Sequence, residues 1–589
     1  MERLIAVVTT EASQGFRTDG GKVLVLGIHQ GHDSSAAIVR DGKIIADVAE
    51  ERFTRLKHCN HVPSNAISYC LKAAGVENIN EVDLVAIPAK TGNTLVQIVL
   101  GVHQPSKSAL KRAMKAGLAS RGYRRYGEDV RPPIYFPDFR LEDPDKLVFV
   151  EHHLAHAASA YFTQPSPDRC LVFTVDGVGD GVSMAVWVGE GDQIHPLQRL
   201  GAEASVGWAY SIVTEALHWW HGDGEGKTMG LAPYGDHEKC AGVLDHLFPV
   251  FNGTKLEEPI RLGQAFYWAE SGSTQFHFEE AYEVEALADR LGRENIAAEA
   301  QRKLEECVGP WVDAWVKKER CPRTAFAGGV FLNVKLNQRI WNNRGSAMTE
   351  QHVFPNPGDA GLALGAALHA YHQQHRFEGY ELDDIYWGPE FANDYIKHLL
   401  DDRHLSYTLS ANPAKEAAEL LADNKIVAWF QGRMESGPRS LGNRSILMSP
   451  LKPENKDIIN AKVKFREAFR PFCPSLLWEK RHDYLEDVRD ECFMITSFDV
   501  KPEKRDAIPA VVHVDGTVRP QMVRRESNAR YWDLINEFGK ITGEYILLNT
   551  SFNTMGEPII NTPSEAIRCF YDGGLDALFL GDYLLRKGF

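Results

Sequence analysis

The segment of residues 151–181, EHHLAHAASAYFTQPSPDRCLVFTVDGVGDG, decides the fold. Its alanine-rich first part favours a helix, which the Pro-Ser-Pro run at 165–167 ends. The apolar, β-branched run LVFTV then predicts a buried strand that stops at Asp176. A hairpin pattern follows, so the segment predicts a helix, a strand, a glycine-bearing loop and a hairpin in that order.

The same segment carries candidate metal ligands. His152 and His156 are four residues apart, so on a helix both imidazoles project from one face. Together with Asp176 at the strand end, they suit a divalent metal of the iron or zinc type. Ordinary polar packing of the histidine pair is the alternative. We expect Gly177 and Gly179 to lie in a loop whose backbone N–H groups approach a phosphate.

A similar order of elements occurs near the N-terminus. Residues 22–28, 34–40 and 43–51 read as strands, and Asp41-Gly42 is a strong hairpin signal between the last two. A polar loop from His29 to Ser35 follows the first strand. Two such units predict a duplicated ribonuclease-H-like fold, similar to the ASKHA (actin, Hsp70 and sugar kinase) superfamily.

Composition limits the class of protein. A chain of 589 residues exceeds one ordinary core, so two or more domains are expected. A net charge of −15 argues against nucleic acid as the main partner. Nine scattered cysteines without a Cys-x-x-Cys pair fit a reducing cytoplasm, and no apolar run is long enough to span a membrane. We therefore expect a soluble, cytoplasmic protein.

Several connecting stretches are open to two interpretations. Residues 1–21 show no pattern and predict an extension, and the basic stretch 90–140 predicts a helical lid or interface. The charge run 50–58 is typical of a solvated connector. Asp359, before a helix, is either an N-cap or a further metal ligand. The acidic connector between residues 374 and 388 predicts a domain boundary.

Beyond that boundary, basic and small polar residues recur at strand ends and glycine turns. One isolated arginine is usually a surface ion pair contributing under ~1 kcal/mol. Many together in an acidic protein predict a pocket for a small molecule that bears a phosphate or carboxylate. The candidate residues are Arg439, Arg444, Lys464, Arg466, Arg470, Arg519, Asn549 and Ser551.

One ordered set of motifs resembles the NodU/CmcH O-carbamoyltransferases, which modify antibiotics and nodulation factors. The set comprises His32-Asp33, the run Glu51 to Arg55 with Lys57-His58, His152-x-x-x-His156, residues 227–235, Gly328-Gly329 and residues 436–442. The resemblance runs from about residue 22 to the C-terminus. It implies an ASKHA-type metal-binding domain over 22–375 and an α+β, YrdC-like domain over 388–589.

The resemblance also implies a two-step reaction. In the YrdC-like domain, carbamoyl phosphate and ATP with Mg²⁺ would give carbamoyl-adenylate, whose carbamoyl group then passes to an acceptor hydroxyl in the first domain. A metal, iron(II) or another divalent ion, would be held by His152, His156, Asp176 and Asp359. Carried over by motif, the other site residues are His32 and Lys57 near the adenylate, Gly328, Gly329 and Asn333 along the nucleotide, and Arg439, Lys464, Arg470, Arg519 and Ser551 around carbamoyl phosphate and ATP.

Some points stay open at this level. Either His32 or Asp33 could act as the base for the acceptor hydroxyl. The acceptor is expected to be a hydroxylated small molecule of undefined identity, and a homodimer is left open. The competing functions are threonylcarbamoyl-type modification of tRNA and nucleotide binding by an ASKHA protein without transfer chemistry.

Overall fold

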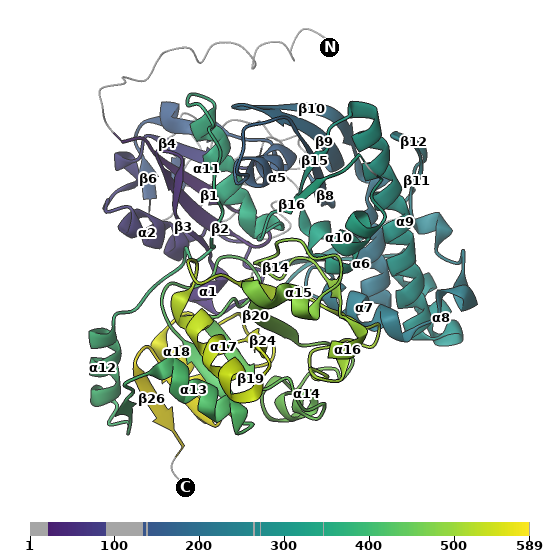
Figure 1. The fold of residues 1–589 in the computed structure, drawn as a ribbon. Helices are drawn as coiled ribbons and strands as arrows, with labels where there is room; N and C mark the ends of the chain where they lie inside the picture. The colour runs from purple at the N-terminus through teal and green to yellow at the C-terminus, as the bar shows by residue number, and fades with distance from the viewer. Residues whose placement is uncertain are drawn as a thin grey trace.

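The computed structural model describes residues 22–89, 134–136, 139–262, 265–270, 273–345 and 347–587. The expected N-terminal extension and most of the basic stretch 90–140 lie outside these residues. The described chain forms two five-stranded sheets in its N-terminal part and an eight-stranded sheet in its C-terminal part (Figure 1).

The first sheet has the strand order β3-β2-β1-β4-β7. Strands β1, β2 and β3 pair antiparallel, and β4 and β7 continue the sheet in parallel from β1. The turn between β2 and β3 is the predicted Asp41-Gly42 pair, in which both residues have positive φ. The bounds are β1 Leu24–His29, β2 Ser35–Arg40, β3 Lys43–Ala49, β4 Leu84–Ile87 and β7 Leu147–Phe149.

The second sheet repeats this arrangement, with the order β10-β9-β8-β15-β16. Its first three strands pair antiparallel and its last three pair parallel. The prediction of a duplicated ribonuclease-H-like fold is therefore confirmed. The bounds are β8 Cys170–Gly179, β9 Val182–Glu190, β10 Gln193–Leu200, β15 Arg323–Ala327 and β16 Glu350–Val353.

Two helices lie between these sheets, and each covers the sheet of the other half. Helix α5 (His152–Tyr161) follows the first sheet in the chain but packs on β8 and β15. Helix α11 (Leu362–His372) follows the second sheet but packs on β1, β2 and β4. The two helices also pack on each other, so close that a Cβ on Gly365 would lie 1.9 Å from the carbonyl oxygen of Ala155.

The remaining N-terminal elements cover the outer faces of the sheets. Helix α2 closes the first core, and α6 and α9 pack with the second sheet. The helices are α1 Glu51–Thr54, α2 Ser64–Ala73, α6 Val206–Ala216, α7 Glu225–Leu231, α8 Glu280–Leu291, α9 Arg293–Glu319 and α10 Val334–Asn342. Short hairpins are formed by β5 Ile134–Phe136 with β6 Phe139–Leu141, β11 Val250–Asn252 with β12 Lys255–Glu258, and β13 Ala265–Glu270 with β14 Ser273–Phe278.

The C-terminal sheet has the order β17-β26-β25-β18-β19-β24-β20-β23, which gives the expected α+β domain. Helices α13 and α17 contribute to the core on one face, and α12 and α18 to the core on the other. The strands are β17 Thr408–Leu409, β18 Val427–Phe430, β19 Arg444–Met448, β20 Cys473–Leu477, β23 Gln521–Val523, β24 Ile546–Ser551, β25 Ala577–Leu580 and β26 Tyr583–Arg586. A two-stranded ribbon joins β21 Phe498–Asp499 to β22 Thr517–Val518, and the helices are α12 Asn393–Asp402, α13 Pro413–Ala422, α14 Asn455–Ile459, α15 Arg481–Tyr484, α16 Pro502–Arg505, α17 Ala529–Thr542 and α18 Pro563–Asp572.

Two local predictions are wrong. Strand β8 does not stop at Asp176 but continues to Gly179, so Gly177 and Gly179 lie in a strand and not in a phosphate-binding loop. The charge run 50–58 is not a solvated connector, because Arg52 is buried and α1 lies at the boundary with the C-terminal sheet (Figure 1). Within the described residues, no helix combines the length and apolar character that crossing a bilayer requires.

Candidate functional site

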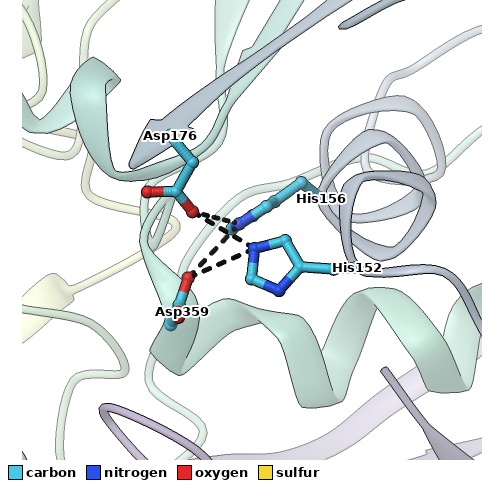
Figure 2. A group of neighbouring side chains, drawn as sticks. All are labelled: His152, His156, Asp176 and Asp359. Atoms are coloured by element: carbon cyan, nitrogen blue, oxygen red, sulfur yellow. Dashed lines mark hydrogen bonds and ion pairs between the residues drawn. The ribbon is translucent and has the colours of Figure 1, made fainter. Parts of the chain in front are cut away.

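Four side chains from three parts of the N-terminal fold converge on one point (Figure 2). His152 and His156 come from one face of α5, Asp176 from β8, and Asp359 from the turn that precedes α11. The Nε2 atoms of His152 and His156 lie 3.2 and 3.1 Å from Oδ2 of Asp176. The same two nitrogens lie 3.6 and 3.4 Å from Oδ1 of Asp359.

This geometry fits a bound divalent metal. Metal–ligand bonds of about 2.1 Å at angles of roughly 90–110° place ligand atoms about 3.0–3.4 Å apart. Burial acts to lower the pKa of His156, but its hydrogen bonds to Asp176 and Asp359 raise that pKa to about 9. His152, His156, Asp176 and Asp359, which we call the metal-ligand cluster, therefore stabilise positive charge at their centre. Two imidazoles and two carboxylates suit iron(II) or zinc, and the metal role itself stays a prediction.

Gly177 and Gly179 make room for neighbouring rings. A Cβ on Gly179 would lie 2.1 Å from the His152 ring, and one on Gly177 would lie 2.9 Å from the indole nitrogen of Trp208. Gly179 is therefore needed for the approach of His152 to Asp176. Neither glycine is placed in the loop geometry that the predicted nucleotide contact requires.

A second cluster joins the first β-strand loop to the segment after α1. Asp33 lies between two imidazoles, 3.0 Å from Nδ1 of His32 and 2.7 Å from Nδ1 of His58. Asp223 lies 3.5 Å from Nε2 of His58 and accepts a 2.8 Å hydrogen bond from Nζ of Lys57. We call these five residues the transfer cluster. It brings together His32, Asp33 and Lys57, which the sequence analysis singled out.

The acidic and basic side chains of the transfer cluster favour opposite charges on one another. Burial alone would raise the pKa of Asp33, but His32 and His58 hold that pKa well below its usual range. Burial likewise opposes ionisation of His58, yet Asp33 and Asp223 raise its pKa well above the ordinary value. The pKa of His32 is also raised: partial desolvation of its 47% exposed side chain acts to lower this pKa, but Asp33 outweighs it. Asp33 is therefore a carboxylate and acts as the acceptor for both rings.

His29 connects the transfer cluster to the metal-ligand cluster. Its side chain is buried, and Nε2 lies 3.0 Å from the carbonyl oxygen of His32. Burial lowers the pKa of His29, and both Asp359 and Asp33 act on it electrostatically. The charge of Asp359 therefore acts on the loop that carries His29 and His32.

The C-terminal domain holds a third cluster, which is cationic. Burial, and then the neighbouring Arg519, lower the pKa of Arg439 to about 9. Burial, and then Arg470, lower the pKa of Arg466 to about 9 as well. Lys464 is buried, and its Nζ donates to Oδ1 of Asn553 at 2.6 Å. Within the described chain, Glu467 is the one carboxylate recorded in an ion pair with this set, 3.6 Å from Arg470. We call Arg439, Lys464, Arg466, Arg470 and Arg519 the cationic cluster.

Two predicted members of this pocket serve the fold instead. Arg444 is fully buried, and its guanidinium donates to the carbonyl oxygens of Gln431 at 2.7 Å and Pro389 at 3.0 Å. Arg444 is thus not placed to bind a phosphate, and that prediction is wrong. Nδ2 of Asn549 donates to the carbonyl of Ser440 at 3.1 Å and so supports the neighbouring loop. Ser551 lies beside Lys464, with its hydroxyl 3.3 Å from Nζ.

The glycine turn after β15 packs against the end of β8. A Cβ on Gly328 would lie 2.2 Å from the carbonyl oxygen of Val175, and one on Gly329 would lie 3.0 Å from Oδ1 of Asp176. Asn333 caps α10, and its side chain exchanges hydrogen bonds with Gln301. A cavity of about 390 Å³ opens at Gln301, lined by Gln301, Glu305, Lys335, Gln338, Asp499 and Thr517 among others. Gly329 therefore borders Asp176, Gly328 packs on the neighbouring Val175, and Asn333 is bonded to Gln301 at the cavity wall. Their nucleotide role stays a prediction.

Sequence reasoning missed several residues of these clusters. The sequence assigns Arg466 to the anion pocket but gives His29, His58 and Asp223 no role of their own. His58 adjoins Lys57 in a quoted motif, which was a usable signal. Asp223 lies 165 or more positions from its partners Lys57 and His58 in the chain, so no local pattern could assign it.

Comparison with known proteins places this site in a family. The family model described as "Carbamoyltransferase N-terminus" matches residues 24–368, and "Carbamoyltransferase C-terminus" matches residues 418–587. Nodulation protein NolNO of Sinorhizobium fredii is 36% identical over 94% of this chain and 79% of its own. Nodulation protein U of Rhizobium tropici is 27% identical over 96% of both. The structure of T. kodakarensis HypF, with 13% identity over 60% of this chain and 48% of its own, has a TM-score of 0.30, too low to support an inference. The matches to both family models, over most of the chain, show that it belongs to the carbamoyltransferase family.

Proposed function

We propose that this carbamoyltransferase makes carbamoyl-adenylate from carbamoyl phosphate and ATP, and then transfers the carbamoyl group to a hydroxyl of a small molecule. The cationic cluster carries this proposal. Four arginines and Lys464, whose one carboxylate ion-pair partner within the described residues is Glu467, suit an anionic substrate in a protein of net charge −15. Carbamoyl phosphate and the triphosphate of ATP are such anions.

The first half of the reaction needs the cationic cluster. Hydrolysis of carbamoyl phosphate gives carbamate and phosphate. A carbamate oxygen then attacks the α-phosphorus of ATP, the α–β bond breaks and pyrophosphate leaves. Arg439 and Arg519 would neutralise the negative charge that develops on the phosphates. Enclosure by the two domains protects carbamate, which is unstable in water.

The second half needs the transfer cluster. The acceptor oxygen attacks the carbamoyl carbon, AMP leaves, and the acceptor proton passes to a base. His32 is the better candidate, because Asp33 is already bonded to two imidazoles and its pKa is held low. Asp33 then orients His32. A metal bound by His152, His156, Asp176 and Asp359 would polarise the carbamoyl carbonyl or hold the nucleotide phosphate.

One cavity of the protein supports a proposal for where the nucleoside binds. The cavity at Gln301 offers amide, carboxylate and ammonium groups from Gln338, Glu305 and Lys335. Such groups suit the hydrogen-bonding edges of a base and ribose. We propose this cavity for the adenosine of the adenylate, with its phosphate directed to Gly328 and Gly329.

The test follows pyrophosphate and carbamoyl-adenylate by mass spectrometry when the protein is given carbamoyl phosphate, ATP, Mg²⁺ and iron(II). Arg439→Gln is expected to raise the KM for carbamoyl phosphate by roughly 10–100-fold, because a charge-assisted hydrogen bond contributes about 1.5–3 kcal/mol. Arg525→Gln, which removes a more exposed arginine paired with Asp533, is the matched control. If the native protein forms neither product, the proposed function is wrong.

A further inference from the structure

The loop Ser436–Arg439 of the C-terminal domain is clamped against the N-terminal fold. The hydroxyl of Ser436 donates to Oδ2 of the buried Asp47 on β3. The guanidinium of Arg52 on α1 donates to the carbonyl oxygen of Gly437 at 2.7 Å. Gly437 has a φ of +85°, and a Cβ there would lie 3.2 Å from Cβ of Asn356. The loop is therefore held from two sides.

This loop borders both reaction sites. Arg439, two residues after Gly437, belongs to the cationic cluster. Asn356, which packs against Gly437, precedes the metal-ligand candidate Asp359 by three residues. A shift of the loop would therefore displace Arg439.

The segment that carries Arg52 also joins the domains at a second point. Arg55, at the end of α1, donates to the carbonyl oxygens of Ile559 at 2.7 Å and Pro558 at 2.6 Å. It also lies 3.7 Å from a carboxylate oxygen of Glu565. Two residues later the chain reaches Lys57, in the transfer cluster. The same short segment thus contacts the C-terminal domain and contributes Lys57 to the transfer cluster.

The chemistry of Arg52 suits a positioning role. Its residue surface is 5% exposed, and its guanidinium lies 3.4 Å from the carboxylate of Glu51 on the same helix. A buried guanidinium is planar and permanently charged, so it fixes the direction of its hydrogen bond more tightly than the flexible ammonium of a lysine would. The carbonyl of Gly437 lies 385 positions further along the chain, so this hydrogen bond joins the N-terminal fold to the C-terminal domain.

We infer that Arg52 is a positioning residue for the donor half of the reaction: it fixes the loop Ser436–Arg439, and thereby Arg439, against the transfer site. This inference rests on the proposed function, because Arg439 is taken to bind carbamoyl phosphate. Arg52 itself touches no reacting atom. Its removal should weaken substrate binding in the other domain while leaving the metal-ligand cluster intact.

The test measures initial rates of pyrophosphate formation at varied carbamoyl phosphate for the native protein, Arg52→Ala and Arg52→Lys. Arg40→Ala is the matched control, because Arg40 also donates to a backbone carbonyl, that of Ala74, within the N-terminal fold. We expect Arg52→Ala to raise the KM for carbamoyl phosphate at least tenfold, roughly the effect of one charge-assisted hydrogen bond. The iron content should match that of Arg40→Ala, and Arg52→Lys should recover part of the affinity.

A KM for Arg52→Ala within about twofold of the Arg40→Ala value would overturn the inference. Gly437→Ala serves as an independent variant that keeps Arg52 and pushes the loop away from Asn356. It should raise the same KM, and an unchanged KM there would also count against the inference. If the native protein forms no pyrophosphate, the proposed function fails before Arg52 is tested.

Discussion

Asp47 gives the domain contact a pH dependence that can be measured. It is a buried carboxyl on β3 whose Oδ2 accepts the hydrogen bond from Ser436. Burial raises its pKa from 3.8 to about 7, although contacts with Ser436 and Asn356 act in the opposite direction. The perturbation is Asp47→Asn, which keeps the shape and an acceptor for Ser436 but removes the ionisation.

The direction in which stability changes with pH follows from the protons that the folded and unfolded states bind. Between pH 4 and pH 7 the folded state holds a proton on Asp47 that the unfolded chain has lost, so stability falls as pH rises. Each pKa unit corresponds to about 1.4 kcal/mol, so the shift to about 7 amounts to about 4 kcal/mol of stability. That stability is fully present below pH 3.8 and is lost once pH has passed about 7. Because Asn cannot ionise, the Asp47→Asn variant keeps this stability as pH rises.

The assay compares thermal midpoints of the native protein and Asp47→Asn from pH 5 to pH 8. The variant should gain about 3 kcal/mol relative to the native protein over this range, which corresponds to roughly 5–10 °C for a domain of this size. Asp168→Asn, at an exposed carboxylate paired with Arg323, should show no such trend. A difference between the Asp47→Asn and native midpoints that stays constant with pH would refute the reasoning.

Four further predictions concern the site. His156→Ala should reduce bound iron from about one per chain to a small fraction, measured by metal analysis, whereas His195→Ala should retain it. Gly179→Ala should also lose metal, because its Cβ would lie 2.1 Å from the His152 ring, but pyrophosphate formation should continue. His32→Asn should abolish carbamoyl transfer and spare pyrophosphate formation. The native transfer rate should fall as pH drops through the pKa of His32, which lies above 6.5, since the base must be unprotonated.

Much of the fold could be predicted because its signals are local. The Asp41-Gly42 turn, the alternating apolar strands and the alanine-rich helix each depend on neighbours in the chain. The repeated order of elements then indicated the duplication. The spacing of His152 and His156 placed both imidazoles on one helix face for the same reason.

The predictions from the sequence fail where residues distant in the chain determine the role of a side chain. Gly177 and Gly179 looked like an open loop, but the space beside Gly179 is filled by the ring of His152. Arg444 looked like a phosphate ligand, but folding surrounds its guanidinium with backbone carbonyls. Arg55 finds its carbonyl partners more than 500 positions away, which no local charge pattern reveals.

The placement of α5 and α11 between the two sheets has a consequence for cutting the chain. Each helix covers the sheet of the other half, so a break in the connection after α5, at residues 163–169, would leave both fragments with an uncovered apolar sheet face. Neither fragment should fold alone, whereas the two produced together should reassemble. The candidate metal ligands would then be divided between fragments, with His152 and His156 on one and Asp176 and Asp359 on the other. Bound iron would therefore report reassembly directly, and the N-terminal part could act as a split reporter.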